Sequence, residues 1–560
     1  MKGKRAMKSS TGMAIMLLFS SAINAAAMQE VFSGSLGNVN FHAGGGHMAV
    51  SEVMYTLPGA FAPAQRIVCA ISNGQDKIML LTLNNNANPP SVTLRETLTV
   101  QNLSLDQHVF DISFMTIETG PTSGPRSCLV IPVYDRSISN SGTIYVFDLE
   151  TRTLYEDCLS WGKFRPPRGE VVHVGQQKKS SNDHVYTVSI EGEIYIASLD
   201  NSGGKPVFKL DTRYNLGNCY YAAASDSFPF RAYETYNNIG CNSLTTTGTA
   251  ITTGHVGGVL LWDPLNTESP VLGWIRCAQV GWSDHNIYLH GKMVCGTYLG
   301  DIHRVAVLND EDDHPALIFC TTAGMGFLVY DIHDPREPKF VWQWDNDTRI
   351  HANNGVSGSF SWFGSGSGDV ASGYIPGTNA PGEVFGVGLS RNPETRMIHV
   401  YIGNGIDGLR AFDFSHFFSV FEDGFQPARN FRHFEVFHQS KLSDASNCPM
   451  LAWEVRTHTD LSGDTYVFTT WKDRVGDSGD PIGELALTVH RDTAPALPYR
   501  ADRYDRNHSN LPQALSVGFS SPNPAEESVV FDLGSPDEHS VLSIYDMSGR
   551  LVRRDTPAFR

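Results

Sequence analysis

Several histidines stand at the start of short apolar segments in this chain, and imidazole is well suited to proton transfer and metal binding near neutral pH. If these segments are the inner strands of a repeated sheet, the histidines converge, and three imidazoles can hold one transition metal ion. The structural alternative is that the same side chains lie in turns or line a channel and bond to neighbouring backbone. The first candidates for a metal site are His108, His285 and His351.

Clusters of Asp, Asn and Gly form a second kind of candidate cation site, because their oxygen atoms are ligands that Ca²⁺ prefers. None has the spacing of a calcium-binding EF-hand loop, and Asp and Asn are also common turn residues. The sequence therefore establishes no cofactor, and Ca²⁺ and a transition metal are the two candidates. The clusters are 200–204, 345–347 and 404–408.

The segment 353–388 is longer than an ordinary connection, and long connections are often functional. Its aromatic side chains can stack on a sugar or peptide ligand, and the alternative is a loop folded over one face of the protein. The aromatic candidates in this segment are Trp362, Phe363 and Tyr374.

A tyrosine-rich insertion between Cys219 and Cys241 is a second candidate ligand loop. In an oxidising compartment these two cysteines can form a disulfide that closes the insertion. Other cysteines lie inside apolar segments, where a thiol behaves as a small buried hydrophobic group, and these are Cys69, Cys128, Cys295 and Cys320. The tyrosines of the insertion are Tyr220, Tyr221, Tyr233 and Tyr236.

The net charge of −17, from 59 acidic and 42 basic residues, argues against binding nucleic acid through a basic surface. The sequence contains no G-x-S-x-G elbow, no H-E-x-x-H motif and no phosphate-binding P-loop. A catalytic pair of carboxylates stays open as a hypothesis, because the acidic residues offer many combinations. The low fraction of charged residues, 18%, together with 52 glycines and 29 prolines favours an all-β protein with many turns.

One phrase recurs along the middle of the chain and would position these residues. It is a short apolar strand, a glycine turn, and a second alternating strand that ends near Asp, which together form a hairpin. A repeated hairpin predicts a β-propeller over 28–495, with seven blades favoured and six to eight allowed, and an array of β-sandwiches is the alternative. The clearest copies are 142–148, 192–198, 258–263, 326–331 and 408–413, with weaker ones at 76–81, 301–306 and 483–487.

Two copies continue through a proline into a further strand, at 263–273 and 331–342. Proline cannot donate to a sheet ladder, so this position suits the entry to an outer strand. The extended phrase resembles the LVIVD repeat of secreted bacterial β-propellers. The resemblance implies a propeller outside the cytoplasm and says more about location than about activity.

The first 27 residues have the three parts of a secretory signal peptide. A basic segment is followed by the apolar run 13–19 and then by small residues up to Ala27. The run is too short to span a bilayer, and no later segment is long and apolar enough to be a transmembrane segment. We therefore expect an exported protein.

The end of the chain reads as a linker, 496–515, and a partial module, 516–560, with a proline-rich beginning and two short alternating strands. Its most characteristic residues are Pro522, Asn523, Pro524, Tyr545, Asp546, Gly549 and Arg550. This pattern resembles the C-terminal sorting module of bacterial type IX secretion, an immunoglobulin-like sandwich related to the flagellar hook-cap domain. The resemblance implies that secretion machinery is a partner and that the protein is secreted or displayed at the cell surface.

These observations favour an exported propeller that acts as a binding, adhesion or scaffold protein, with an extracellular protein or carbohydrate as its ligand. The alternative is an extracellular enzyme with its site in the channel, either a polysaccharide hydrolase or lyase or a metal-dependent oxidoreductase. Converging histidines or paired carboxylates favour the enzyme, and a channel without them favours binding. The fold alone does not decide between the two.

Overall fold

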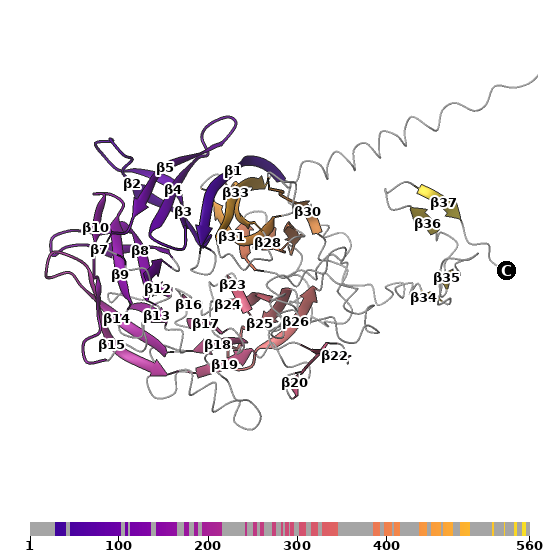
Figure 1. Ribbon diagram of the computed structural model, residues 1–560. Helices are drawn as coiled ribbons and strands as arrows, with labels where there is room; N and C mark the ends of the chain where they lie inside the picture. The colour runs from indigo at the N-terminus through magenta and orange to yellow at the C-terminus, as the bar shows by residue number, and fades with distance from the viewer. Residues whose placement is uncertain are drawn as a thin grey trace, which may run out of the picture. The chain divides into compact units, whose positions relative to one another are not determined.

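The computed structural model is all-β, with no helix among the residues it describes (Figure 1). The chain divides into two compact units, Met1–Leu497 and Pro498–Arg560. No helix in the described part is long and apolar enough to cross a membrane. The described residues are 28–40, 45–101, 103, 107–109, 112–135, 142–164, 173–177, 184–188, 193–215, 241–243, 250–254, 258–262, 271–275, 282–283, 286–289, 292–295, 302–309, 315–322, 327–344, 385–392, 397–405, 408–414, 436–444, 450–460, 463–473, 482–492, 518–519, 531–532, 542–545 and 551–555.

The described residues of the first unit form seven sheets of four or five strands, which we number I to VII in chain order, and one smaller sheet. In sheets I to III the strands pair antiparallel, except that β11 pairs parallel with β15. Sheet I contains β2 (Met48–Tyr55), β3 (Ala64–Ser72), β4 (Lys77–Asn84) and β5 (Ser91–Thr99); sheet II contains β6 (Gln107–Val109), β7 (Ser113–Glu118), β8 (Pro125–Asp135), β9 (Thr143–Asp148) and β10 (Thr153–Tyr155); sheet III contains β11 (Leu159–Ser160), β12 (His173–Gln177), β13 (His184–Val188), β14 (Glu193–Asp200) and β15 (Val207–Asn215).

The next sheets repeat the same antiparallel order along the chain. The smaller sheet lies between sheets IV and V in sequence. Sheet IV contains β16 (Cys241–Ser243), β17 (Ala250–Gly254), β18 (Gly258–Trp262) and β19 (Val271–Ile275); the smaller sheet contains β20 (Trp282–Ser283), β21 (Asn286–Leu289) and β22 (Lys292–Cys295); sheet V contains β23 (Ile302–Asn309), β24 (Pro315–Thr322), β25 (Phe327–Asp331) and β26 (Lys339–Trp344); sheet VI contains β27 (Val387–Asn392), β28 (Met397–Gly403), β29 (Leu409–Asp413) and β30 (Val436–Ser440).

Sheet VII combines the two ends of the first unit. Its strand order is β31-β32-β33-β1, so the first strand of the described chain completes the last large sheet. β1 pairs with β33 from Met28 opposite Asp492 to Asn40 opposite Ile482, with two bulges on the way. The strands are β1 (Met28–Asn40), β31 (Leu451–Thr459), β32 (Thr465–Lys472) and β33 (Ile482–Asp492).

The recurrent phrase of the sequence occupies one position in these sheets. Its copies form β4, β9, β14, β18, β25, β29 and β33. Each of these is an interior strand and the third along the hydrogen-bonded order of its sheet, counted from β2, β6, β12, β16, β23, β27 and β31, respectively. The segment 301–306 differs, because it contributes to β23, the first strand of sheet V. The strands entered after a proline, β19 and β26, lie at the outer end of their sheets, as their missing amide donor suggests.

Burial explains why the middle strands have apolar residues at consecutive positions and not only at alternate ones. All eight residues of β32 are buried, and so are the six central residues of β4, whereas β5 at the edge of sheet I is exposed along most of its length. A strand that is covered on both faces favours apolar side chains on both of them. The buried Cys69, Cys128 and Cys320 have free thiols, which confirms the prediction of core cysteines for these three.

Hydrophobic clusters join six of the seven large sheets to at least one neighbour within the described residues. Separate clusters link sheets I and II, II and III, V and VI, VI and VII, and VII and I. Sheet IV contacts sheet III through β16 and sheet V through β17. Sheet VII therefore packs against both sheet VI and sheet I, and its β31 contacts β2 and β27, the first strands of those neighbours.

The second unit contributes two short hairpins. One pairs β34 (Gly518–Phe519) with β35 (Phe531–Asp532), and the other pairs β36 (Leu542–Tyr545) with β37 (Leu551–Asp555). Tyr545 of the predicted sorting motif lies at the end of β36. The other residues of that motif lie outside the described residues.

Candidate functional site

A β-bulge in β31 places the side chains of Trp453 and Glu454 next to each other in the chain opposite a single residue of β32. Ala452 lies opposite Trp471 and Val455 lies opposite Thr469, so Trp453 and Glu454 share Thr470 as their partner on β32. The extra residue in a bulge redirects side chains, and bulges are common beside functional sites. Thr470 fixes the bulge, because its hydroxyl accepts the Glu454 amide at 3.2 Å and donates to the carbonyl oxygen of Gly46 at 3.0 Å.

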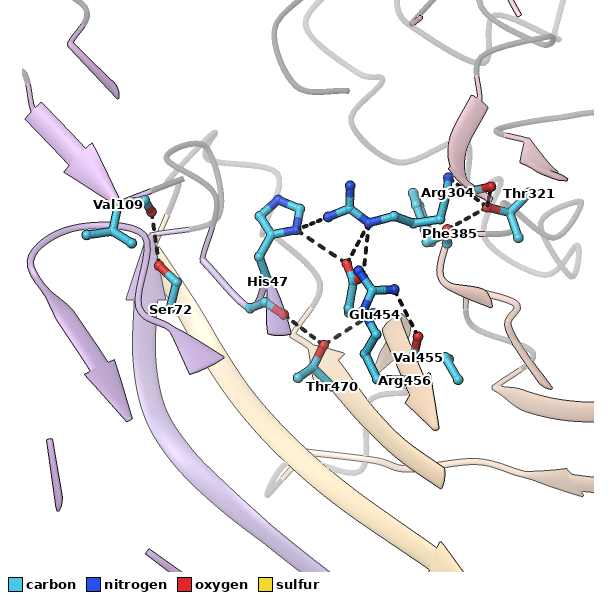
Figure 2. A network of polar contacts seen from close by, with 11 residues as sticks. His47, Ser72, Val109, Arg304, Thr321, Phe385, Glu454, Val455, Arg456 and Thr470 are labelled. Atoms are coloured by element: carbon cyan, nitrogen blue, oxygen red, sulfur yellow. Dashed lines mark hydrogen bonds and ion pairs between the residues drawn. The ribbon is translucent and has the colours of Figure 1, made fainter. Parts of the chain in front are cut away.

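The Glu454 carboxylate joins side chains from three sheets (Figure 2). Nε of Arg304 donates to Oε1 at 3.0 Å and to Oε2 at 3.1 Å. Nδ1 of His47 lies 3.3 Å from Oε2 and 2.5 Å from Nη2 of Arg304. Nη2 of Arg456 forms an ion pair with Oε1 at 2.5 Å. We call these four residues the Glu454 cluster; it connects the start of sheet I with β23 of sheet V and β31 of sheet VII.

The Glu454 cluster is almost completely buried. The exposed fractions of the side chains are 2% for Glu454, 4% for His47 and 7% for Arg304, against 29% for Arg456. Burial alone raises the pKa of a carboxyl, but the two guanidinium groups and the hydrogen bond with His47 outweigh it and hold the pKa of Glu454 far below its ordinary value. Glu454 is therefore a permanent anion at physiological pH and cannot serve as a general acid there.

Contacts of its own strand and of the neighbouring strand fix the position of the Arg304 backbone. A register shift precedes it in β23, and its amide donates to the Thr321 hydroxyl at 3.0 Å. The Thr321 hydroxyl is also 2.6 Å from the carbonyl oxygen of Phe385, at the entry to β27. The next residue, Gly386, allows the close approach of this segment to β31, because a Cβ atom at that position would lie 2.3 Å from the amide nitrogen of Val455.

Trp453 provides an aromatic surface beside the cluster. Its ring lies 4.3 Å from the ring of Phe385 and 6.4 Å from that of His47, between centroids. The ammonium group of Lys472 stands 2.9 Å from the Trp453 ring centroid, a cation–π arrangement. Trp453 is only partly buried, so an aromatic face, a partly exposed guanidinium and a fixed carboxylate lie together on β31.

A second buried polar network lies between sheets VI and VII. Nδ1 of His399 is 2.6 Å from Oδ2 of Asp492, and the Tyr401 hydroxyl donates to the same oxygen. Burial, followed by the charge of Asp492, raises the pKa of Tyr401 well above its ordinary value. With His399 and Tyr401 at 1% and 0% exposure, this network is placed to hold two sheets together.

The residues predicted to do chemistry lie mostly outside the described part of the chain. His108 is in β6, opposite Tyr134 of β8, and Cys241 begins β16. Within the described residues, no group of three or more His, Cys, Asp or Glu side chains is arranged to hold a metal ion. The predicted residues outside that part are Cys219, Tyr220, Tyr221, Tyr233, Tyr236, His285, His351, Trp362, Phe363 and Tyr374.

One of the three predicted calcium clusters, 200–204, lies within the described residues, and a second, 404–408, does so except for residues 406 and 407. Asp200 accepts the amide of Ser202 at 2.9 Å and forms an ion pair with Lys209, so it stabilises the turn between β14 and β15. Asn404 is completely buried in the turn after β28, and its side-chain amide has no hydrogen-bond partner. The third cluster, 345–347, lies outside the described residues.

Sequence reasoning missed the Glu454 cluster, because His47, Arg304 and the 454–456 segment are separated from one another by about 150 residues or more and form no motif. One signal was present. Glu454 interrupts the apolar run 451–455 and Arg304 directly precedes the apolar run 305–308, and a charge in such a position needs a partner when it is buried. Comparison of the chain with protein-family models gave no match, and comparison with curated proteins gave none either.

Proposed function

We propose that this chain is an exported binding or scaffold protein built on a seven-bladed β-propeller. Three observations support the fold. Seven sheets contain the same four-stranded antiparallel order, with one added strand in sheets II and III, each large sheet has neighbours on both sides, and sheet VII contacts sheet I. The β1–β33 pairing is also consistent with a ring, because a blade that contains strands from both ends of the first unit would close the ring and cover a sheet edge.

The proposed location outside the cytoplasm rests on the two ends of the sequence. Residues 1–27 have the pattern of a signal peptide, and 516–560 resemble a sorting module. On this proposal the chain crosses the inner membrane first and is then secreted or displayed at the cell surface. The secretion machinery is the partner of the C-terminal segment.

The enclosure of the Glu454 carboxylate by Arg304, Arg456 and His47 is the observation that favours binding over acid–base catalysis at this site. An acid–base catalyst needs a pKa near the working pH, whereas two arginines and a histidine keep this carboxylate ionised. A fixed carboxylate, a partly exposed arginine and an aromatic ring instead resemble the few polar groups and aromatic surface that orient a bound ligand. We place the ligand site on β31, with the part of the Trp453 ring that Lys472 and Phe385 leave exposed as the stacking surface and Arg456 as its polar partner.

The proposal commits to an extracellular polysaccharide as the ligand, because a sugar ring can stack on Trp453 while its hydroxyl groups bond to Arg456. The test is affinity electrophoresis of the purified full chain through gels that contain neutral or acidic polysaccharides. A parallel assay measures the reducing ends released from the same polymers. We expect slower migration in at least one gel without release of reducing ends.

A variant pair makes the test specific to β31. Trp453→Ala removes the proposed stacking surface. The matched control is Trp161→Ala, because Trp161 is also partly buried but packs against the hydrophobic cluster of sheets II and III. Retardation should be lost in the first variant and kept in the second. Release of reducing ends by the wild-type chain would support the enzyme alternative, and equal retardation of both variants would contradict the proposed site.

A further inference from the structure

Two histidines meet where the outer parts of sheets VI and VII pack together. His438 lies on β30 and His490 on β33, and their ring centroids are 5.6 Å apart with the planes inclined at 59°. His438 is opposite Ala411, and His490 is opposite Val467. Ala411 and Val467 belong to the same hydrophobic cluster between these two sheets, so both imidazoles face the same interface.

Each ring has one buried nitrogen that lacks a hydrogen-bond partner. These atoms are Nε2 of His438 and Nδ1 of His490. His490 is 3% exposed, and a polar atom in such a place loses its hydrogen bonds to water without a replacement. A single ligand bound to both nitrogen atoms would explain why neither has a hydrogen-bond partner.

The charged groups around the pair favour a cation. Asp492, two residues after His490 on β33, lowers the cost of positive charge at His438, although its Oδ2 already accepts from His399 and Tyr401. Glu30 of β1 lies directly opposite His490, so its side chain projects from the same face of sheet VII, and it is exposed.

Both imidazoles are in the form that binds metals. Burial, together with neighbouring His438, lowers the pKa of His490 to about 4. Burial also lowers the pKa of His438, against the opposing charge of Asp492. The two rings are thus neutral at physiological pH, and a neutral imidazole nitrogen is a ligand for zinc and similar ions.

We propose that His438 Nε2 and His490 Nδ1 bind one divalent transition metal ion of the zinc class between sheets VI and VII. With metal–nitrogen bonds of about 2.1 Å, the centroids of two imidazoles on one ion are roughly 5–6.5 Å apart, which includes the separation of this pair. Glu30 is the carboxylate placed to become a third ligand by turning its side chain, and solvent completes the coordination. The site is separate from the Glu454 cluster and from the proposed ligand site.

The test measures Zn²⁺ binding to the untagged full chain after removal of metals with a chelator. Competition with a chromophoric chelator gives the affinity, and mass spectrometry of the folded protein gives the stoichiometry. The variants are His438→Gln and His490→Gln, with His333→Gln as the control, because His333 is exposed on the turn after β25. Mg²⁺ serves as the control ion, since it prefers oxygen ligands.

We expect one tight Zn²⁺ site in the wild type and in His333→Gln, and an affinity at least about tenfold weaker in each of the other two variants. If His490→Gln does not fold, His438→Gln and His438→Ala still decide, because His438 is only partly buried. Equal Zn²⁺ affinity in the wild type and the His438 variants would overturn the proposal. The absence of saturable Zn²⁺ binding, as expected if a water molecule joins the two nitrogens, would overturn it too.

Discussion

Replacing Glu454 with glutamine keeps the shape of the side chain and removes the charge that Arg304 and His47 face. Arg304 and Glu454 are 7% and 2% exposed, so their interaction belongs to the buried class. Removing one partner of a buried ion pair costs about 3–5 kcal/mol, because the remaining charge stays out of water without compensation. The partly exposed Arg456 adds at most about 1 kcal/mol, since solvent screens its charge. We expect Glu454→Gln to lose about 3–5 kcal/mol of unfolding free energy at pH 7.

The pH dependence of this loss gives a second check. The pKa of Glu454 is lowered in the folded state, so the unfolded chain takes up a proton first as the pH falls. The stabilisation by the ionised carboxylate is therefore present above its unfolded pKa of about 4.3 and is lost as the pH falls towards the lower folded value. Glutamine cannot titrate, so the difference between wild type and variant should be constant from pH 6 to 8 and shrink below about pH 4.

Urea unfolding followed by tryptophan fluorescence measures both quantities. The control is Glu337→Gln, at an exposed position in the turn before β26, which should change stability by less than about 0.5 kcal/mol. A loss below about 1 kcal/mol for Glu454→Gln at pH 7 would refute the buried-pair reasoning. A difference that grows towards acid pH would refute the assignment of Glu454 as a permanent anion.

Three other perturbations test the rest of the structure. Asp492→Asn should destabilise the protein by about 2–4 kcal/mol, because the Asp492 carboxylate accepts hydrogen bonds from two side chains. Tyr401→Phe should cost only about 1 kcal/mol, because it removes one of these hydrogen bonds. Equal losses of unfolding free energy in urea would contradict this. Gly408→Ala and Gly37→Ala both place alanine at positive φ, at 88° and 89°, but only the first brings a Cβ within 1.9 Å of the Ser440 carbonyl oxygen. We expect about 1–2 kcal/mol for Gly37→Ala and at least about 2 kcal/mol more for Gly408→Ala, measured the same way, and similar values would show that Ser440 moves aside. Deleting 516–560 should leave the folded chain in the periplasm, and immunoblots that find it still in the medium would contradict the sorting role.

The all-β fold could be predicted because its signals are local. Apolar segments, glycine turns and terminal Asp residues follow one another within a few positions, and the third strands β4, β9, β14, β18, β25, β29 and β33 lie at these segments. The segment 301–306 shows the limit of the method. It has the same short apolar pattern but forms the first strand of sheet V, because pairing depends on which neighbour covers its faces.

The Glu454 cluster could not be predicted for a related reason. Its geometry depends on a bulge at Trp453 and Glu454, and a bulge is a property of the register between two strands and not of either segment alone. His47, Arg304 and Glu454 become neighbours only after three sheets have packed together. The partnering of His438 with His490 is likewise set by the packing of sheets VI and VII. Sequence spacing contains none of this information.

The pairing of β1 with β33 is the contact on which the proposed ring depends most directly. Native-state hydrogen exchange on the full chain, followed by mass spectrometry or NMR, reports it through the amides of 482–492. With β32 on one side and β1 on the other, β33 is an interior strand, and its amides should be protected along its length. Rapid exchange at alternate residues would show that the β1-facing amides are exposed to water, and the proposed closure would then be wrong.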